Sequence, residues 1–383
     1  MTSRLLAVLG VLVFTAVSAL SLGGPLFYLI ALTLLAMILY GLISAWLNLL
    51  LTAVTQTLSD TKLERGGEAS LDISLVTKSP LPAGPLFMRL SLPDGAAQTM
   101  MYPGFLKPRT ARVPLRFPHV GIWRCGADRV LFTDIFGLFR FKKQLKQGER
   151  EMMVLPRGFE VQPLVFARMD DVRALPNQAG EDITSPEDTR AYREGDPFKR
   201  IHWKLSLRNR ELVVRRFEVP SPPDTLILMD CTDPLGVDTE PDGMLRLRDT
   251  LCETALAVAA MQIGGEHPIR LPLYGARQSE FRADRALSLS LLKEELACQL
   301  FRGGEPFDKV LSLELRRMRR TGATIVITTR LDAQVVEGIN NIRASGPSVR
   351  FYLITFAPGD ERYAPYIARL QQHLVEVCYV TPP

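Results

Sequence analysis

The N-terminal part of the chain is a long apolar stretch with no charged side chain between Arg4 and Asp60. A helix needs about 20 apolar residues to cross the hydrocarbon core of a bilayer. The stretch has room for two such helices, and a glycine–proline segment at 21–25 divides it, because both residue types interrupt helices. The pattern predicts two transmembrane helices, over Leu5–Leu20 and Leu26–Leu51.

The charges beside these spans predict an orientation. Arg4 precedes the first span, Lys62 and Arg65 follow the second, and the turn between the spans has no charge. The positive-inside rule then places both ends in the cytoplasm. We therefore expect residues 1–55 to form a hairpin in the cell membrane, with the soluble domains cytoplasmic. A cleaved signal peptide is the competing interpretation, and the second apolar span that follows at once disfavours it.

Residues 56–160 alternate short apolar runs with turn-forming residues. The runs are Ala69–Val76, Leu86–Leu92, Ala111–Phe117, Gly121–Cys125 and Met152–Leu155. Short strands at this spacing, separated by proline and glycine turns, predict a small antiparallel β-sandwich-like domain.

Residues 224–383 combine two other patterns. Thr225–Met229 and Ala323–Thr328 are short apolar runs of the kind that form buried parallel strands, and Leu245–Met261 has helical spacing. Strands that alternate with helices predict a doubly wound α/β domain. Residues 161–223 form a connector that is rich in charge.

Composition narrows the class of protein. The 383 residues are 47% hydrophobic and 23% charged, and the net charge of +5 does not by itself indicate a nucleic-acid partner. The five cysteines are scattered, with no CxxC pair, and we expect reduced thiols. The sequence has no glycine-rich loop ending in GKS or GKT, so it does not predict ATP binding through a P-loop.

The connector carries a motif that extends into both neighbouring domains. The motif residues in the connector are Arg190, Tyr192, Gly195, Asp196, Arg200, Ile201, Trp203, Lys204, Arg208, Leu212 and Glu218. The preceding domain closes with Asp134–Phe139 and Val154–Arg157, and the following domain opens with an apolar strand that reaches Asp230. In this order the motif resembles the family called Domain of Unknown Function 58, over about residues 60–300.

The resemblance implies an architecture and a partner. Members of that family look like membrane-anchored proteins with a von Willebrand factor A-like domain. They are often encoded beside MoxR-type AAA+ ATPases, and sometimes beside transglutaminase-like membrane proteins. No biochemical activity is established for the family, so the resemblance implies no reaction.

The segment from Asp230 to Pro234 is the first candidate site. Von Willebrand A-like domains bind Mg²⁺ with Asp-x-Ser-x-Ser at this place, since a hard cation prefers oxygen ligands. Here Asp230 and Thr232 supply two ligands, but Pro234 has no side-chain oxygen. Arg330 follows the strand where such domains carry an aspartate, and we predict an Arg330–Asp230 ion pair in place of the metal. A phosphatase centred on Asp230 would need a second aspartate where Thr232 stands.

The basic connector is the second candidate site. Between positions 190 and 216 the sequence contains nine lysines and arginines and three acidic residues. Three interpretations stay open. The motif residues could join the two domains through ion pairs and packing, they could dock an acidic protein partner, or they could contact anionic lipid or nucleic acid. The residues concerned are Arg190, Tyr192, Asp196, Arg200, Trp203, Lys204 and Arg208.

Together these patterns predict a membrane-tethered adaptor that is not an enzyme. Its expected partners are the lipid bilayer and, by resemblance, a MoxR-type AAA+ ATPase, with no nucleic acid. A Mg²⁺-dependent hydrolase or metal-dependent binding domain centred on Asp230 is one alternative. A cell-envelope factor that acts with a transglutaminase-like protein is another.

Overall fold

The computed structural model describes most of the chain. The described residues are 3–82, 84–93, 97–102, 109–146, 148–162, 188–192, 201–216, 224–234, 241–284, 287–301, 304–318 and 321–383. They form two compact units, residues 1–156 and residues 157–383.

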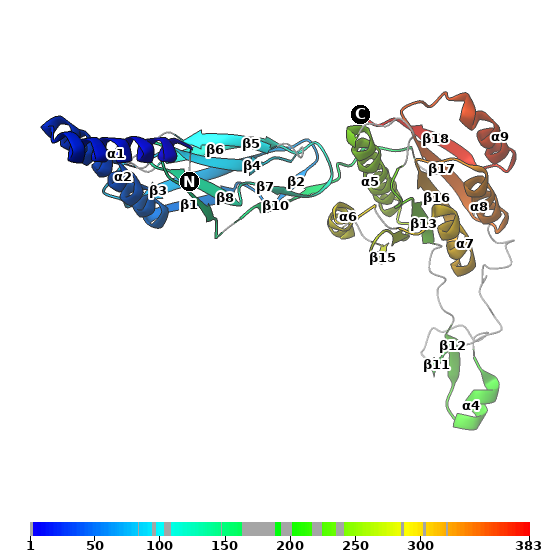
Figure 1. The fold of residues 1–383 in the computed structure, drawn as a ribbon. Helices are drawn as coiled ribbons and strands as arrows, with labels where there is room; N and C mark the ends of the chain where they lie inside the picture. The colour runs from blue at the N-terminus through cyan, green and yellow to red at the C-terminus, as the bar shows by residue number, and fades with distance from the viewer. Residues whose placement is uncertain are drawn as a thin grey trace. The chain divides into compact units, whose positions relative to one another are not determined.

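Unit 1 begins with the two apolar helices that the sequence predicts. Helix α1 spans Ser3–Leu22 and helix α2 spans Pro25–Leu51, and both are long and apolar enough to cross a membrane. Gly23 permits the tight turn between them because its φ of +63° lies in the left-handed region. The two helices pack side by side (Figure 1).

In the described part of unit 1, ten strands follow, the first of them directly after α2. They are β1 (Thr52–Leu58), β2 (Lys62–Glu64), β3 (Glu68–Thr77), β4 (Leu86–Ser91), β5 (Ala97–Tyr102), β6 (Arg109–Arg116), β7 (Gly121–Cys125), β8 (Arg129–Thr133), β9 (Arg140–Gln144) and β10 (Arg150–Leu155). They form sheets of order β1-β3-β6, β2-β10-β7 and β5-β4-β8-β9. Among the described residues of unit 1, all strand pairs are antiparallel except β2 with β10, which are parallel. The expected antiparallel architecture needs this one correction.

One hydrophobic core joins the three sheets. Strands β3, β4, β6, β8 and β10 alternate buried and more exposed positions, as half-buried strands do. Their inward side chains, such as Leu71, Met88, Leu115 and Val154, belong to the same buried cluster. This shared core fixes the loops at the ends of the strands.

Unit 2 contains a six-stranded sheet of order β15-β14-β13-β16-β17-β18. The strands are β13 (Asp224–Met229), β14 (Ile269–Tyr274), β15 (Gln278–Ala283), β16 (Thr321–Thr328), β17 (Ser348–Ile354) and β18 (Glu376–Val380). Five run parallel and β15 runs antiparallel at the edge. The sheet is therefore mixed and mostly parallel, because a hairpin adds β15 antiparallel beside β14.

Helices cover both faces of this sheet (Figure 1). They are α5 (Pro241–Gly264), α6 (Ser288–Ala297), α7 (Phe307–Arg317), α8 (Ala333–Ala344) and α9 (Ala364–Gln372), and a 3₁₀ turn at Glu361–Tyr363 leads into α9. Helices α5 and α6 share one buried cluster with the sheet, and α7, α8 and α9 share another. The expected α/β domain with helices on two faces is confirmed.

A smaller element lies within the connector. Strands β11 (Asp188–Ala191) and β12 (Val213–Arg216) pair antiparallel, with the short helix α4 (Trp203–Asn209) between them in sequence. His202 caps α4, since its Nδ1 accepts a hydrogen bond from the Leu205 amide at 3.3 Å. The Ser206 hydroxyl ties the helix to β12 by accepting from the Val213 amide at 2.9 Å.

Candidate functional site

The first candidate site lies at the carboxyl edge of the sheet in unit 2. Strands β13 and β16 are parallel neighbours, so their carboxyl ends meet there. Asp230 follows β13 and Thr328 closes β16, and both side chains are buried. Open α/β sheets bind their ligands outside this edge.

The carboxylate of Asp230 is fully engaged by hydroxyl and amide donors. Its Oδ1 accepts from the Thr232 amide at 2.9 Å and from the Thr232 hydroxyl at 2.6 Å. Its Oδ2 accepts from the Thr328 hydroxyl at 2.7 Å. Because a buried carboxylate needs such donors, the two threonines hold Asp230 as a link between the ends of β13 and β16.

Two arginines converge on the next acidic residue. Arg248 of α5 forms an ion pair with the Asp233 carboxylate and lies 5.8 Å from the ring centroid of Phe301. Arg330 donates from Nη2 to the main-chain carbonyl of Asp233. The Asp230–Pro234 loop is therefore fastened to α5 on one side and to the loop after β16 on the other.

The predicted Arg330–Asp230 ion pair was wrong. Both residues lie in the described part of the chain, and the contacts of Arg330 are with the Asp233 carbonyl and, through its amide, with the Thr328 hydroxyl at 3.0 Å. The two threonine hydroxyls already occupy the Asp230 carboxylate, so it does not need a guanidinium. Arg330 closes the loop instead of replacing a cation.

The donor set does not fit a divalent cation. Both hydroxyls that could serve as ligands, those of Thr232 and Thr328, point their protons at Asp230. Asp230 is only 1% exposed, and Pro234 has no side-chain oxygen to serve as a ligand. Among the described residues, no cluster of three His, Cys, Asp or Glu side chains could hold a metal. Two arginines beside the loop add positive charge where a cation would bind.

Cys231 lies in the same loop and is not a candidate nucleophile. Its thiol is buried, and burial, together with the charge of Asp230, raises the pKa of Cys231 to about 12. A thiol is nucleophilic as its thiolate, which this environment disfavours.

The structure brings several connector residues into one element. Arg190 lies in β11 opposite Val214, and the Tyr192 amide donates to the Leu212 carbonyl at 2.8 Å. Trp203, Lys204 and Arg208 lie on α4 with exposed side chains. The other two predicted residues, Asp196 and Arg200, lie outside the described residues.

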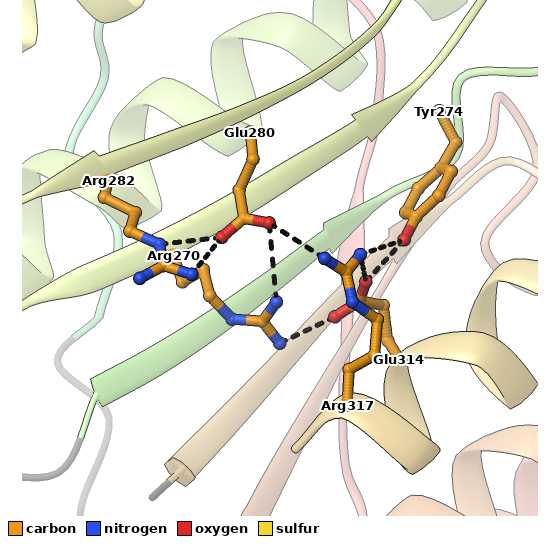
Figure 2. A network of polar contacts seen from close by, with 6 residues as sticks. All are labelled: Arg270, Tyr274, Glu280, Arg282, Glu314 and Arg317. Carbon is orange, nitrogen blue, oxygen red and sulfur yellow. Dashed lines mark hydrogen bonds and ion pairs between the residues drawn. The ribbon is translucent and has the colours of Figure 1, made fainter. Parts of the chain in front are cut away.

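Sequence reasoning missed a buried polar network between β14, β15 and α7 (Figure 2). At its centre the fully buried carboxylate of Glu314 accepts from Arg270 at 2.6 Å, from the Tyr274 hydroxyl at 2.5 Å and from Arg317 at 3.0 Å. Burial, followed by the hydrogen bond and charge of Glu314, raises the pKa of Tyr274. The phenol therefore remains a donor to Glu314.

Glu280 of β15 extends the network toward the sheet edge. It pairs with Arg282 at 2.6 Å and lies 3.5 Å from Arg317 and 3.9 Å from Arg270. Burial raises the pKa of Glu280, but the three arginines outweigh burial and leave that pKa below its usual value. Two sequence signals point to this network. Glu314 occupies a position of α7 where the helical spacing calls for an apolar residue, and Arg270 lies inside the apolar strand β14.

No family model matches the sequence. The chain is 24% identical over 219 residues to the uncharacterized protein YeaD of Bacillus subtilis, which covers 54% of this chain. The chain spans about half the length of that curated relative, namely 55%.

Solved structures resemble the chain only weakly. The alkylpurine DNA glycosylase AlkC of Pseudomonas fluorescens is 14% identical, with a TM-score of 0.17, over 34% of this chain and 42% of its own. A β-glucuronidase of Parabacteroides merdae is 8% identical, with a TM-score of 0.20, over 86% of this chain and 40% of its own. Similarities at this level support no inference about fold or function.

Proposed function

We propose that this protein is a membrane-anchored adaptor of the Domain of Unknown Function 58 type, which binds a protein partner and catalyses no reaction. By the family resemblance, the partner is a MoxR-type AAA+ ATPase. The two apolar helices supply the anchor, and unit 2 supplies a von Willebrand A-like α/β scaffold.

The burial and the hydrogen bonds of the Asp230 carboxylate are the observation that carries the proposal. A catalytic carboxylate or metal ligand has to reach a substrate or an ion, and Asp230 is 1% exposed with three donors on its two oxygens. A carboxylate so engaged fastens one strand end to the next. This favours a binding scaffold over the Mg²⁺-dependent hydrolase.

The basic end of unit 1 supports a cytoplasmic orientation. Lys143 of β9 donates to the carbonyls of Leu49 and Thr52 at 2.7 and 3.0 Å, at the point where α2 ends. Arg140 and Lys142 of the same strand are exposed. Cations at this end of the hairpin agree with the positive-inside rule.

We place the docking surface on α4 and its flank. Trp203 is 59% exposed, Leu207 is 80% exposed and Leu212 is 43% exposed. The cations Lys204 and Arg208 lie on the same helix, exposed. An aromatic anchor beside aliphatic side chains and cations suits an acidic partner, because apolar burial supplies affinity and charge speeds association.

Co-purification tests the proposal. The full chain is extracted from membranes in mild detergent, and a MoxR-type AAA+ ATPase from the same cells is looked for among the proteins that it captures. We expect the ATPase to be retained by the unmodified chain, and a Trp203→Ala/Leu207→Ala variant to lose most of it. Leu287→Ala is the matched control, because Leu287 is 87% exposed at the start of α6.

Two results would refute parts of the proposal. Equal retention of the ATPase by all three chains would remove α4 as the docking surface. Turnover of a substrate by the purified chain, abolished by Asp230→Asn, would replace the adaptor by the hydrolase.

A further inference from the structure

The loop between β8 and β9 packs against the second apolar helix. The rings of Phe136 and Tyr40 meet edge to face, with centroids 6.1 Å apart and planes at 67°. Gly41 lies against the same loop, since a β-carbon there would be 3.0 Å from an oxygen of Asp134. The loop, residues 134–139, is therefore held at a fixed level along α2.

The first helix touches the loop as well. Gly137 has a φ of +70°, and a β-carbon at this position would lie 3.1 Å from Nη1 of Arg4. Arg4 stands at the start of α1, beside the end of the hairpin that is remote from the Gly23 turn. Both helices thus contact loop 134–139 near this end.

The rise of an α-helix gives the depth of loop 134–139 in the bilayer. From Pro25 to Tyr40 a helix rises about 23 Å, at 1.5 Å per residue. The hydrocarbon core of a bilayer is about 30 Å thick. If the Gly23 turn lies at one boundary of the core, Tyr40 and the Phe136 ring beside it lie about 7 Å inside the other. Any tilt of the helices brings them deeper.

The side chains of the loop suit such a place. Ile135 is 46% exposed and Phe136 is 41% exposed, although both are large and apolar. Two adjacent apolar side chains on a loop that continues the apolar surface of a helix are costly in water and favourable in lipid.

Main-chain amides of the loop find their hydrogen-bond acceptors within the loop, as hydrocarbon surroundings require. Asp134 is fully buried, and its two carboxylate oxygens accept from the amides of Phe136 at 3.0 Å and of Phe139 at 2.7 Å. The Gly137 amide donates to the Asp134 carbonyl at 3.1 Å. Unsatisfied amides exclude most loops from hydrocarbon, and here three are satisfied within the loop itself.

We propose that loop 134–139 inserts into the cytoplasmic leaflet, with Ile135 and Phe136 among the lipid acyl chains. The exposed Arg140 and Lys142 of β9 follow the loop, where they can reach anionic headgroups. This inference rests on the proposed membrane anchor and goes beyond it. Unit 1 would be fixed to the bilayer by the two helices and by a third, shallow contact.

Depth-dependent quenching tests the insertion. The full chain carries Cys298→Ser and Cys378→Ser, since the other three cysteines are buried. Single cysteines at Ile135 or Phe136 are labelled with an environment-sensitive fluorophore. The labelled chain is reconstituted into phosphatidylcholine–phosphatidylglycerol vesicles that contain nitroxide groups on the acyl chains.

Two matched positions make the test specific. Ile122→Cys places the label on β7, at an isoleucine that is 50% exposed, and reports a surface without insertion. Leu29→Cys places it on α2, at a leucine that is 59% exposed, and reports the anchor itself. We expect strong quenching and a blue-shifted emission at 29, 135 and 136, and severalfold weaker quenching at 122.

The outcomes separate this inference from the anchor. Quenching at 29 with none at 135 and 136 would overturn the insertion and leave the anchor standing. No quenching at 29 would overturn the anchor and the insertion together. Equal quenching at 122 and 135 would show that the loop has no special depth and would also overturn the insertion.

Discussion

The Glu314 network gives the sharpest prediction about stability. Glu314→Gln keeps the shape of the side chain and one acceptor but removes the negative charge that faces Arg270 and Arg317 (Figure 2). Within the described residues, Arg270 would keep Glu280 as its one ion-pair partner, at 3.9 Å, while its side chain is 8% exposed.

The magnitude follows from this burial. Breaking a buried ion pair by removing one partner costs about 3–5 kcal/mol. Because Glu280 still faces Arg270, we expect a loss of stability at the lower end of this range, about 3 kcal/mol. In a unit of this size 1 kcal/mol shifts Tm by about 2–4 °C, so the melting of unit 2 should fall by about 6–12 °C.

Calorimetry of the full chain in detergent measures this shift. Glu337→Gln is the matched control, because Glu337 is exposed on the neighbouring helix α8 and should change stability by less than about 0.5 kcal/mol. Replacing Arg270 and Glu314 together by Met should recover part of the loss, since it leaves no uncompensated buried charge. A Glu314→Gln chain that melts at the same temperature as the Glu337→Gln control would refute the reasoning.

Three further predictions concern other described contacts. Asp230→Asn should destabilise unit 2 by about 1–3 kcal/mol, because the amide keeps only one of the two oxygens that accept from Thr232 and Thr328. A saturable Mg²⁺-induced rise in Tm that the variant lacks would instead identify Asp230 as a metal ligand. Glu280 has a pKa below its ordinary value of 4.5, so its contribution to stability is present above that pH and is lost on acidification below it. Acid titration of Glu280→Gln should therefore show a smaller loss of stability below about pH 4.5 than the unmodified chain, and identical curves would count against the arginine pairing. Lys143→Met should lower the stability of unit 1 by about 1.5–3 kcal/mol through the loss of its bonds to Leu49 and Thr52, with Lys142→Met as an exposed control that leaves calorimetry unchanged.

The sequence predicts elements well where one pattern dominates. The second apolar helix ends at Leu51, as expected, because the uncharged apolar run has no competing signal until the strand that follows it. Strand β14 was missed because Arg270 and Pro272 interrupt its apolar character. Strand β15 was missed because it lies at the edge and carries polar side chains on the face of the Glu314 network.

The candidate site was only partly predictable. The positions of Asp230 and Thr232 follow from the strand that precedes them. The direction of Arg330 does not, because it depends on the turn after Thr328 and on the position of the Asp233 carbonyl. Asp134 belonged to a recognised motif, but its hydrogen bonds to its own loop appear only in three dimensions.

Membrane extraction tests the central claim, that apolar helices tether a binding scaffold to the bilayer, most directly. Membranes that hold the full chain are washed with alkaline carbonate and floated on a density gradient, and the N-terminus is sequenced. We predict that the chain floats with the lipid fraction and retains Ser3–Leu22. Recovery of the chain in the aqueous fraction, cleaved after its first apolar helix, would contradict the account.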